Sequence, residues 1–168
     1  MSIEIVTVAY RPTLSDLRHT LDSLVASRTQ GLPVSWAVWH NDDENGVPPE
    51  LRALYEEAHA RGLPVRQGGG RGNLGFGGGI NALLDNTEAE FVLLLNQDAL
   101  LEPGALERLC SVAQADAADV AAWEMRQIPF EHPKSYDPVT LDTIWVSGAA
   151  VLMRTTALRQ VQGFEPRI

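Results

Sequence analysis

The residues Asn96, Gln97 and Asp98 follow directly on an apolar run, residues 91–95, which is typical of a strand covered on both faces. A carboxylate just beyond a buried strand can hold a hard divalent cation, because such ions prefer oxygen ligands and retain part of their water. Asn96 can add a neutral oxygen or a hydrogen bond. The alternative is that Asn96 and Asp98 only form the turn and help the next helix to begin, and for this segment alone that alternative is the stronger.

A second candidate is the glycine-rich segment 68–79, in which residues 70–75 match the dinucleotide-binding pattern G-x-G-x-x-G. A lone match of this pattern is weak evidence, and here it follows the third expected strand rather than the first. We therefore interpret the glycines as positions where backbone amides approach a ligand, with Asn73 and Asn81 shaping the loop or contacting that ligand. A flexible loop without a ligand is the alternative for residues 68–70.

The turn Asn41-Asp42-Asp43 is a third candidate, because it ends an apolar run at residues 34–39. Acids and amides at a strand end suit the polar edge of a base or a ribose. An exposed turn has the same composition, so the sequence does not decide between the two. We interpret His40 as a partly buried strand-end histidine, and no histidine, cysteine and acid cluster has the spacing of a metal site.

These candidates need a framework, and the hydrophobic pattern predicts one. Short apolar runs predict strands at residues 3–9, 34–39, 63–67, 91–95 and 120–125, and residues 145–153 form a further apolar run with Gly148 inside it. Helical spacing, prolines and caps predict helices near residues 14–25, 49–58, 78–86 and 103–115, with a last short helix capped by Thr155. Strands alternating with helices predict an α/β fold with a mostly parallel sheet and helices on both faces. Ligands bind beyond the carboxyl ends of such strands, which selects residues 9–11, 40–43, 68–75 and 96–98.

Length and composition favour a single globular domain spanning residues 1–168, of which 45% are hydrophobic. The formal charge of -9 argues against general binding to nucleic acid but not against one anionic ligand. The lone cysteine, Cys110, excludes an internal disulfide and is expected to be buried at helical spacing. Neither a signal peptide nor a membrane-spanning run is recognised, so we expect a cytoplasmic protein.

In this order the motifs resemble those of family 2 glycosyltransferases, especially the rhamnosyltransferase-like branch that builds bacterial surface polysaccharides. The resemblance is carried by residues 6–10, 73–81, 93–98 with 103–106, and 147–150 with Arg154 and 163–165. It extends over nearly the whole chain, and its second and third signatures are fairly specific in combination.

The resemblance implies a GT-A fold, inversion at the anomeric carbon, a Mg²⁺ or Mn²⁺ ion, and a UDP- or dTDP-sugar donor such as dTDP-rhamnose. It also implies a glycan or lipid-linked acceptor. A lipid-linked acceptor would bring the protein to the inner face of the membrane as a peripheral protein. Asp98 would hold the ion, and Asn96 would replace the family's frequent first aspartate. The implied donor-binding residues are Ala9, Arg11, Asn41, Asp42, Asp43, Asn73, Gly75, Asn81, Asn96 and Gln97, while Trp145 and Gly148 would lie on the acceptor side.

The chain departs from the family's pattern at two places. The branch usually has Asp-Asn after the second strand, where this chain has His40-Asn41, so base or ribose recognition is expected to shift to Asp42 or Asp43. The family's acid-rich motif, with its general base, lies shortly after the stretch at residues 163–165. We therefore expect the catalytic base beyond Ile168 and a catalytic domain that is incomplete at the C-terminus.

Two other functions compete with a glycosyltransferase. One is a non-catalytic nucleotide-sugar-binding fragment. The other is a dinucleotide-binding oxidoreductase, which only the glycine pattern suggests. The sequence identifies neither the sugar, the base, the acceptor, the linkage nor the oligomeric state.

Overall fold

The computed structural model describes residues 1–27, 31–42 and 47–165. The elements follow one another along the chain as β1 (Ile3–Ala9), α1 (Leu14–Ser27), β2 (Val34–His40), α2 (Pro49–Ala60), β3 (Val65–Gly68), α3 (Gly75–Leu84), β4 (Phe91–Leu95), α4 (Ala105–Ala115), β5 (Ala122–Glu124), β6 (Ala150–Arg154) and α5 (Thr155–Gln160). In the part of the chain described, no helix is long and apolar enough to cross a membrane.

The strands form one sheet in the order β3-β2-β1-β4-β6-β5. Strands β3, β2, β1 and β4 are parallel, whereas β6 is antiparallel to β4 and β5 is antiparallel to β6. The prediction of a mostly parallel α/β sheet is therefore confirmed. The chain moves outward from β1 to β3 and then returns to place β4 on the other side of β1. This reversal creates a switch point between β1 and β4, and ligands of open α/β sheets bind beyond such a point.

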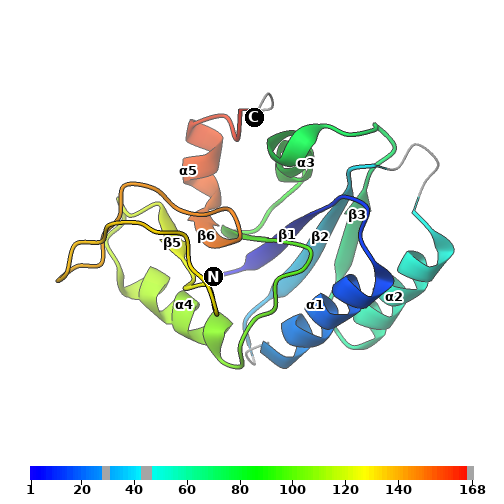
Figure 1. Ribbon diagram of the computed structural model, residues 1–168, viewed down its shortest axis with the longest axis horizontal. Helices are drawn as coiled ribbons and strands as arrows, with labels where there is room; N and C mark the ends of the chain where they lie inside the picture. The colour runs from blue at the N-terminus through cyan, green and yellow to red at the C-terminus, as the bar shows by residue number, and fades with distance from the viewer. Residues whose placement is uncertain (28–30, 43–46, 166–168) are drawn as a thin grey trace.

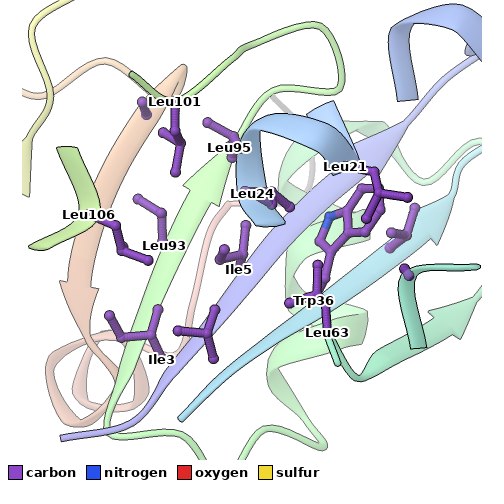
Figure 2. Packing of buried hydrophobic residues seen from close by; sticks show 14 of the residues in the cluster. Ile3, Ile5, Leu21, Leu24, Trp36, Leu63, Leu93, Leu95, Leu101 and Leu106 are labelled. Carbon is purple, nitrogen blue, oxygen red and sulfur yellow. The ribbon is translucent and has the colours of Figure 1, made fainter. Parts of the chain in front are cut away.

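Helices cover both faces of the sheet, as predicted. In Figure 1, α1 and α2 lie together on one face while α3 lies on the opposite face. The side chains of β1 alternate between the two resulting cores, with Ile3 and Ile5 in one and Val6 and Val8 in the other. Figure 2 shows the first core, in which Leu93 of β4 packs on the same face. Full burial of one such aliphatic side chain contributes about 1.5–3 kcal/mol, so the strands form a firm base for the loops at their ends.

Gly68 has a packing role, which argues against the alternative of a flexible loop at this residue. It is the last residue of β3 and lies opposite Trp39 in the parallel ladder. A β-carbon on Gly68 would lie 2.6 Å from the Trp39 ring, so this glycine is required by packing. The same crowding occurs at Gly79 of α3, where a β-carbon would meet both Trp39 and Val8.

Several element boundaries differ from the sequence-based prediction. Helix α3 begins at Gly75 rather than near residue 78, and the apolar run 145–153 forms a strand only from Ala150. Thr155 does not cap α5, because its hydroxyl donates to the carbonyl of Ala89 at 2.7 Å and so ties the helix to the start of β4. Cys110 is buried in α4, as expected.

Candidate functional site

Gln97 joins the carboxyl ends of β1 and β4 at the switch point. Its Oε1 accepts a hydrogen bond from the Tyr10 backbone N–H at 2.8 Å, and its Nε2 donates to the Tyr10 carbonyl at 3.2 Å. The carbonyl of Gln97 in turn accepts from the Thr20 hydroxyl of α1 at 2.9 Å. The carboxamide of Gln97 is thus committed to the protein, and it sets how the two strand ends lie relative to each other.

Asn96 and Asp98 lie on either side of Gln97, and the described part of the chain offers their side chains no partner. No hydrogen bond or ion pair among the described residues involves either side chain, and Asp98 is exposed to solvent. The turn is held instead by the backbone, since Asn96 N–H donates to Ala149 and Ala99 N–H donates to Asn96. Two oxygen-bearing side chains are therefore available to a ligand at the edge of the sheet.

Arg11 and Asp42 connect the ends of β1 and β2. Arg11 adopts a left-handed backbone with φ of 45°, which costs a residue other than glycine about 1–2 kcal/mol. Its backbone N–H donates to Asp42 Oδ2 at 2.9 Å, and its guanidinium lies 5.2 Å from the centre of the Tyr10 ring. Asp42 therefore stabilises the bend by which the chain leaves β1.

A cavity of about 380 Å³ opens beside this bend. Its volume falls within the range of about 300–1,000 Å³ that is usual for small-molecule sites. The cavity is lined by Arg11, Pro12, Leu14, His40, Asp42, Pro48, Glu50 and Leu51. Apolar side chains and two carboxylates are thus combined at the ends of β1 and β2, which suits the flat face and polar edge of a nucleoside.

His40 is buried at the end of β2, more completely than the sequence predicted. Its Nε2 lies 3.1 Å from the Tyr55 hydroxyl, and the two rings meet edge to face. Burial raises the pKa of Tyr55 well above its usual value, so the phenol keeps its proton even at strongly alkaline pH. These contacts favour the interpretation of His40 as a packing residue.

Asn41 holds the glycine-rich segment against the end of β2. The side chain is buried, and its Nδ2 donates to Asn73 Oδ1 at 2.9 Å and to the Gly75 carbonyl at 3.2 Å. Its Oδ1 accepts from Leu74 N–H at 2.9 Å, and Asn73 Oδ1 accepts from Gly75 N–H at 2.8 Å. The expectation that the Gly75 amide approaches a ligand needs correction, because this amide is already bonded within the loop.

Asn81 binds the C-terminal segment of the described chain. Its Nδ2 donates to the Phe164 carbonyl at 2.7 Å, and its Oδ1 accepts from Phe164 N–H at 2.8 Å. Gly163 has φ of 80°, and a β-carbon there would lie 2.3 Å from Asn81 Oδ1. A β-carbon on Gly77 would lie 3.0 Å from the Glu165 carbonyl. The carboxamide of Asn81 therefore fastens α3 to residues 163–165, and the structure does not leave it free for a donor.

The two residues expected on the acceptor side belong to the segment that leads into β6. A β-carbon on Gly148 would lie 3.3 Å from the ring of Phe76, the second residue of α3. The next residue, Ala149, accepts the hydrogen bond from Asn96. Gly148 thus lies between the start of α3 and the end of β4, while Trp145, three residues earlier, has an exposed ring.

The side chain of Ala9 is wholly buried in the first core, so it does not line the cavity as the sequence suggested. Asp43 lies outside the described residues. Tyr10, which the sequence reasoning missed, is 43% exposed directly after β1, and an aromatic residue at the end of a buried strand was the signal that could have found it.

The arrangement of these strand ends is shared with a known protein family. The model described as Glycosyl transferase family 2 matches residues 4–142. This chain belongs to glycosyl transferase family 2. The match covers β1 to β5 and hence the whole edge formed by β1, β2 and β4.

Solved structures support the same fold for this family 2 chain. The mannosyltransferase PcManGT from Pyrobaculum calidifontis, in complex with GDP-Man and Mn²⁺, superposes with a TM-score of 0.72 at 16% identity, covering 99% of this chain and 48% of that one. S. aureus TarS 1-349 in complex with UDP gives a TM-score of 0.73 at 17% identity, covering 99% and 51%. The chain therefore has the GT-A fold and spans about half the length of these structures. No curated protein sequence matches it significantly.

A divalent cation at the edge of this family 2 domain would need a bound ligand to complete its coordination. Across residues 1–27, 31–42 and 47–165, no group of three or more His, Cys, Asp or Glu side chains is placed to hold a metal. Asp98 offers one carboxylate and Asn96 one amide oxygen, and neither has a partner within these ranges. Mg²⁺ commonly binds through one or two carboxylates plus phosphate oxygens and water, so a diphosphate would have to complete this site.

The Gln97→Met variant of this domain tests the junction between β1 and β4. The change keeps the length of the side chain but removes both hydrogen bonds to Tyr10, so the free energy of unfolding should fall by about 1–2 kcal/mol. Nucleotide affinity should fall with it, because the two strand ends lose their fixed separation. Urea unfolding and calorimetry with UDP and Mn²⁺ would measure the two effects. Weaker nucleotide binding at unchanged stability would show instead that Gln97 contacts the ligand directly.

Proposed function

We propose that this chain binds the nucleotide-sugar donor of an inverting glycosyltransferase at the edge formed by the ends of β1, β2 and β4. The observation that carries the proposal is the carboxylate of Asp98, which has no partner among the described residues and lies next to the switch point of a family 2 sheet. Acids at other strand ends, such as Asp42, already bind the protein's own backbone.

In this proposal the two halves of the donor occupy different strand ends. The nucleoside enters the cavity beside Arg11 and Asp42, and the diphosphate lies near Asn96 and Asp98. A bound Mg²⁺ or Mn²⁺ would neutralise charge on the leaving diphosphate. Two solved structures of this fold carry GDP-Man with Mn²⁺ or UDP, which supports a nucleotide ligand and a metal here.

The finer assignments rest on the resemblance to the rhamnosyltransferase-like branch. The donor would be a UDP- or dTDP-sugar, with dTDP-rhamnose as one candidate, and the acceptor a glycan or lipid-linked glycan in surface polysaccharide synthesis. The reaction would take place in the cytoplasm, and at the inner face of the membrane if the acceptor is lipid-linked. We assign the general base to none of the described residues.

A non-catalytic nucleotide-sugar-binding module is the second candidate function, because the proposed donor edge needs no general base. A dinucleotide-binding oxidoreductase is less well supported. The glycine pattern follows β3, at the edge of the sheet, and the amides of Leu74 and Gly75 are bonded to Asn41 and Asn73 rather than open to a diphosphate.

A thermal-shift panel separates these functions. We expect UDP, dTDP or GDP to raise the melting temperature in the presence of Mn²⁺, and NAD to leave it unchanged. A ligand at 100 times its Kd stabilises by about 2.7 kcal/mol, and each kcal/mol shifts the melting temperature of a domain of this size by about 2–4 °C. Stabilisation by NAD alone, or by none of these nucleotides, would refute the proposal. A turnover assay with a bound donor then distinguishes an enzyme from a binding module.

A further inference from the structure

Residues 125–149 join β5 to β6 without a helix or strand, yet a buried ion pair organises them. The Lys134 side chain is 0% exposed and pairs with Glu124 of β5, which is 8% exposed. Burying an ammonium group is costly unless it is paired in good geometry. In Figure 1 this segment runs out from the sheet beside β5 and returns to β6. A segment anchored in this way has a defined shape rather than that of a loose loop.

The buried ammonium of Lys134 lies under an aromatic ring. Its Nζ is 4.2 Å from the centre of the Trp145 ring and 5.9 Å from that of Tyr136. The ring of His132 lies beside Trp145 at a centroid distance of 6.4 Å. Trp145 is nevertheless 42% exposed. Because Lys134 covers one face of the indole, the exposed area belongs to the other face and the edges.

Trp145 belongs to the segment that leads to the proposed donor edge. The next residue, Val146, packs against the core on the α3 face of the sheet. A β-carbon on Gly148 would meet the half-exposed ring of Phe76, and the carbonyl of Ala149 accepts a hydrogen bond from Asn96 N–H. The exposed indole is therefore four residues from a residue bonded to the end of β4.

We propose that Trp145 is a stacking platform for a neutral pyranose ring of the acceptor, and that Lys134 is the residue that positions it. This inference rests on the proposed function, since it assigns the acceptor side of the same site. The negative face of an indole matches the C–H groups on one face of a pyranose. The exposed acids Asp137 and Asp142 in the same segment disfavour an acidic glycan.

Tryptophan fluorescence can test this platform selectively, because Trp36, Trp39 and Trp123 are buried. Acrylamide quenching of the whole chain should report mainly on Trp145. We expect mannopentaose or maltopentaose at millimolar concentration to protect it from quenching, and tetragalacturonate to protect it less. Trp145→Phe should abolish the protectable signal while leaving binding of UDP with Mn²⁺ unchanged.

The Lys134→Met and Lys134→Arg pair tests the positioning role. Lys134→Met removes both the cation–π contact with Trp145 and the ion pair with Glu124, so it should weaken oligosaccharide protection about tenfold, and Lys134→Arg should restore most of it. Failure of both neutral oligosaccharides to protect Trp145, while UDP and Mn²⁺ still bind, would overturn the platform and leave the proposed function standing. Protection that persists in Trp145→Phe would overturn it as well. Absence of UDP binding in the unaltered chain would instead count against the proposed function.

Discussion

Calorimetry on the Asp98→Ala variant is expected to show nucleoside diphosphate binding that no longer responds to Mn²⁺. The Asp98 carboxylate is exposed and has no partner among the residues that the structure describes, so its loss removes no protein contact. Changes to the outer shell of metal sites alone typically cost about 10–100-fold, so loss of the Asp98 carboxylate should cost about 100-fold or more in Mn²⁺-dependent affinity. The melting temperature should stay close to that of the unaltered chain.

Two matched variants separate the effect of the Asp98 charge from that of its shape and from general surface charge. Asp98→Asn keeps the shape of the side chain and removes its charge, so it should lose nearly as much metal-dependent affinity as Asp98→Ala. Asp119→Ala removes one exposed carboxylate before β5 and should bind nucleotide normally. Unchanged metal-dependent affinity in Asp98→Ala would mean that the ion, if it binds, is held elsewhere.

The Asn41→Leu variant should show the largest loss of stability among the substitutions at the candidate site. Asn41 is buried and makes three side-chain hydrogen bonds, to Asn73, Leu74 and Gly75. Asn41 is buried, whereas Asn73 is exposed and Leu74 and Gly75 are partly exposed and can bond to water, so the free energy of unfolding should fall by about 2–3 kcal/mol. Urea unfolding would measure the loss, and the start of α3 should become less protected from amide hydrogen exchange.

Asn41→Asp is the control for this change. It retains an oxygen that accepts from Leu74 N–H but cannot donate to Asn73 or Gly75, so its stability should lie between those of the unaltered chain and Asn41→Leu. Equal stability of Asn41→Leu and the unaltered chain would show that the loop is not held by this side chain.

The sheet could be predicted from the sequence because its pattern is local. The apolar runs of β1, β2 and β4 are nearly continuous, as burial on both faces requires, and the positions of their ends followed directly. Burial of Cys110 followed in the same way from helical spacing. These features depend on residues within one element, and the tertiary packing of the protein agrees with that local pattern.

The sequence could not predict which polar side chains of the site bind the protein's own backbone and which remain available to a ligand. Asn41, Asn81 and Gln97 are polar residues at or near strand ends and the glycine loop, as Asp98 is, yet their carboxamides bind backbone groups 33 to 87 residues away. A polar side chain that binds a distant backbone and one that awaits a ligand have the same local sequence. Gly68 and Gly79 show the same limit, since the ring of Trp39 that excludes their β-carbons is contributed by another strand.

Paramagnetic broadening by Mn²⁺ tests the central claim most directly, because it locates the ion within the chain. Backbone amide signals would be recorded with UDP, dTDP or GDP present, before and after small additions of Mn²⁺. We expect the amides of residues 96–98 to broaden first, and those of the distant end of α2 to stay sharp, with the effect absent in Asp98→Ala. Broadening centred on another acidic surface, or equal broadening in Asp98→Ala, would contradict a metal-dependent donor site at the end of β4.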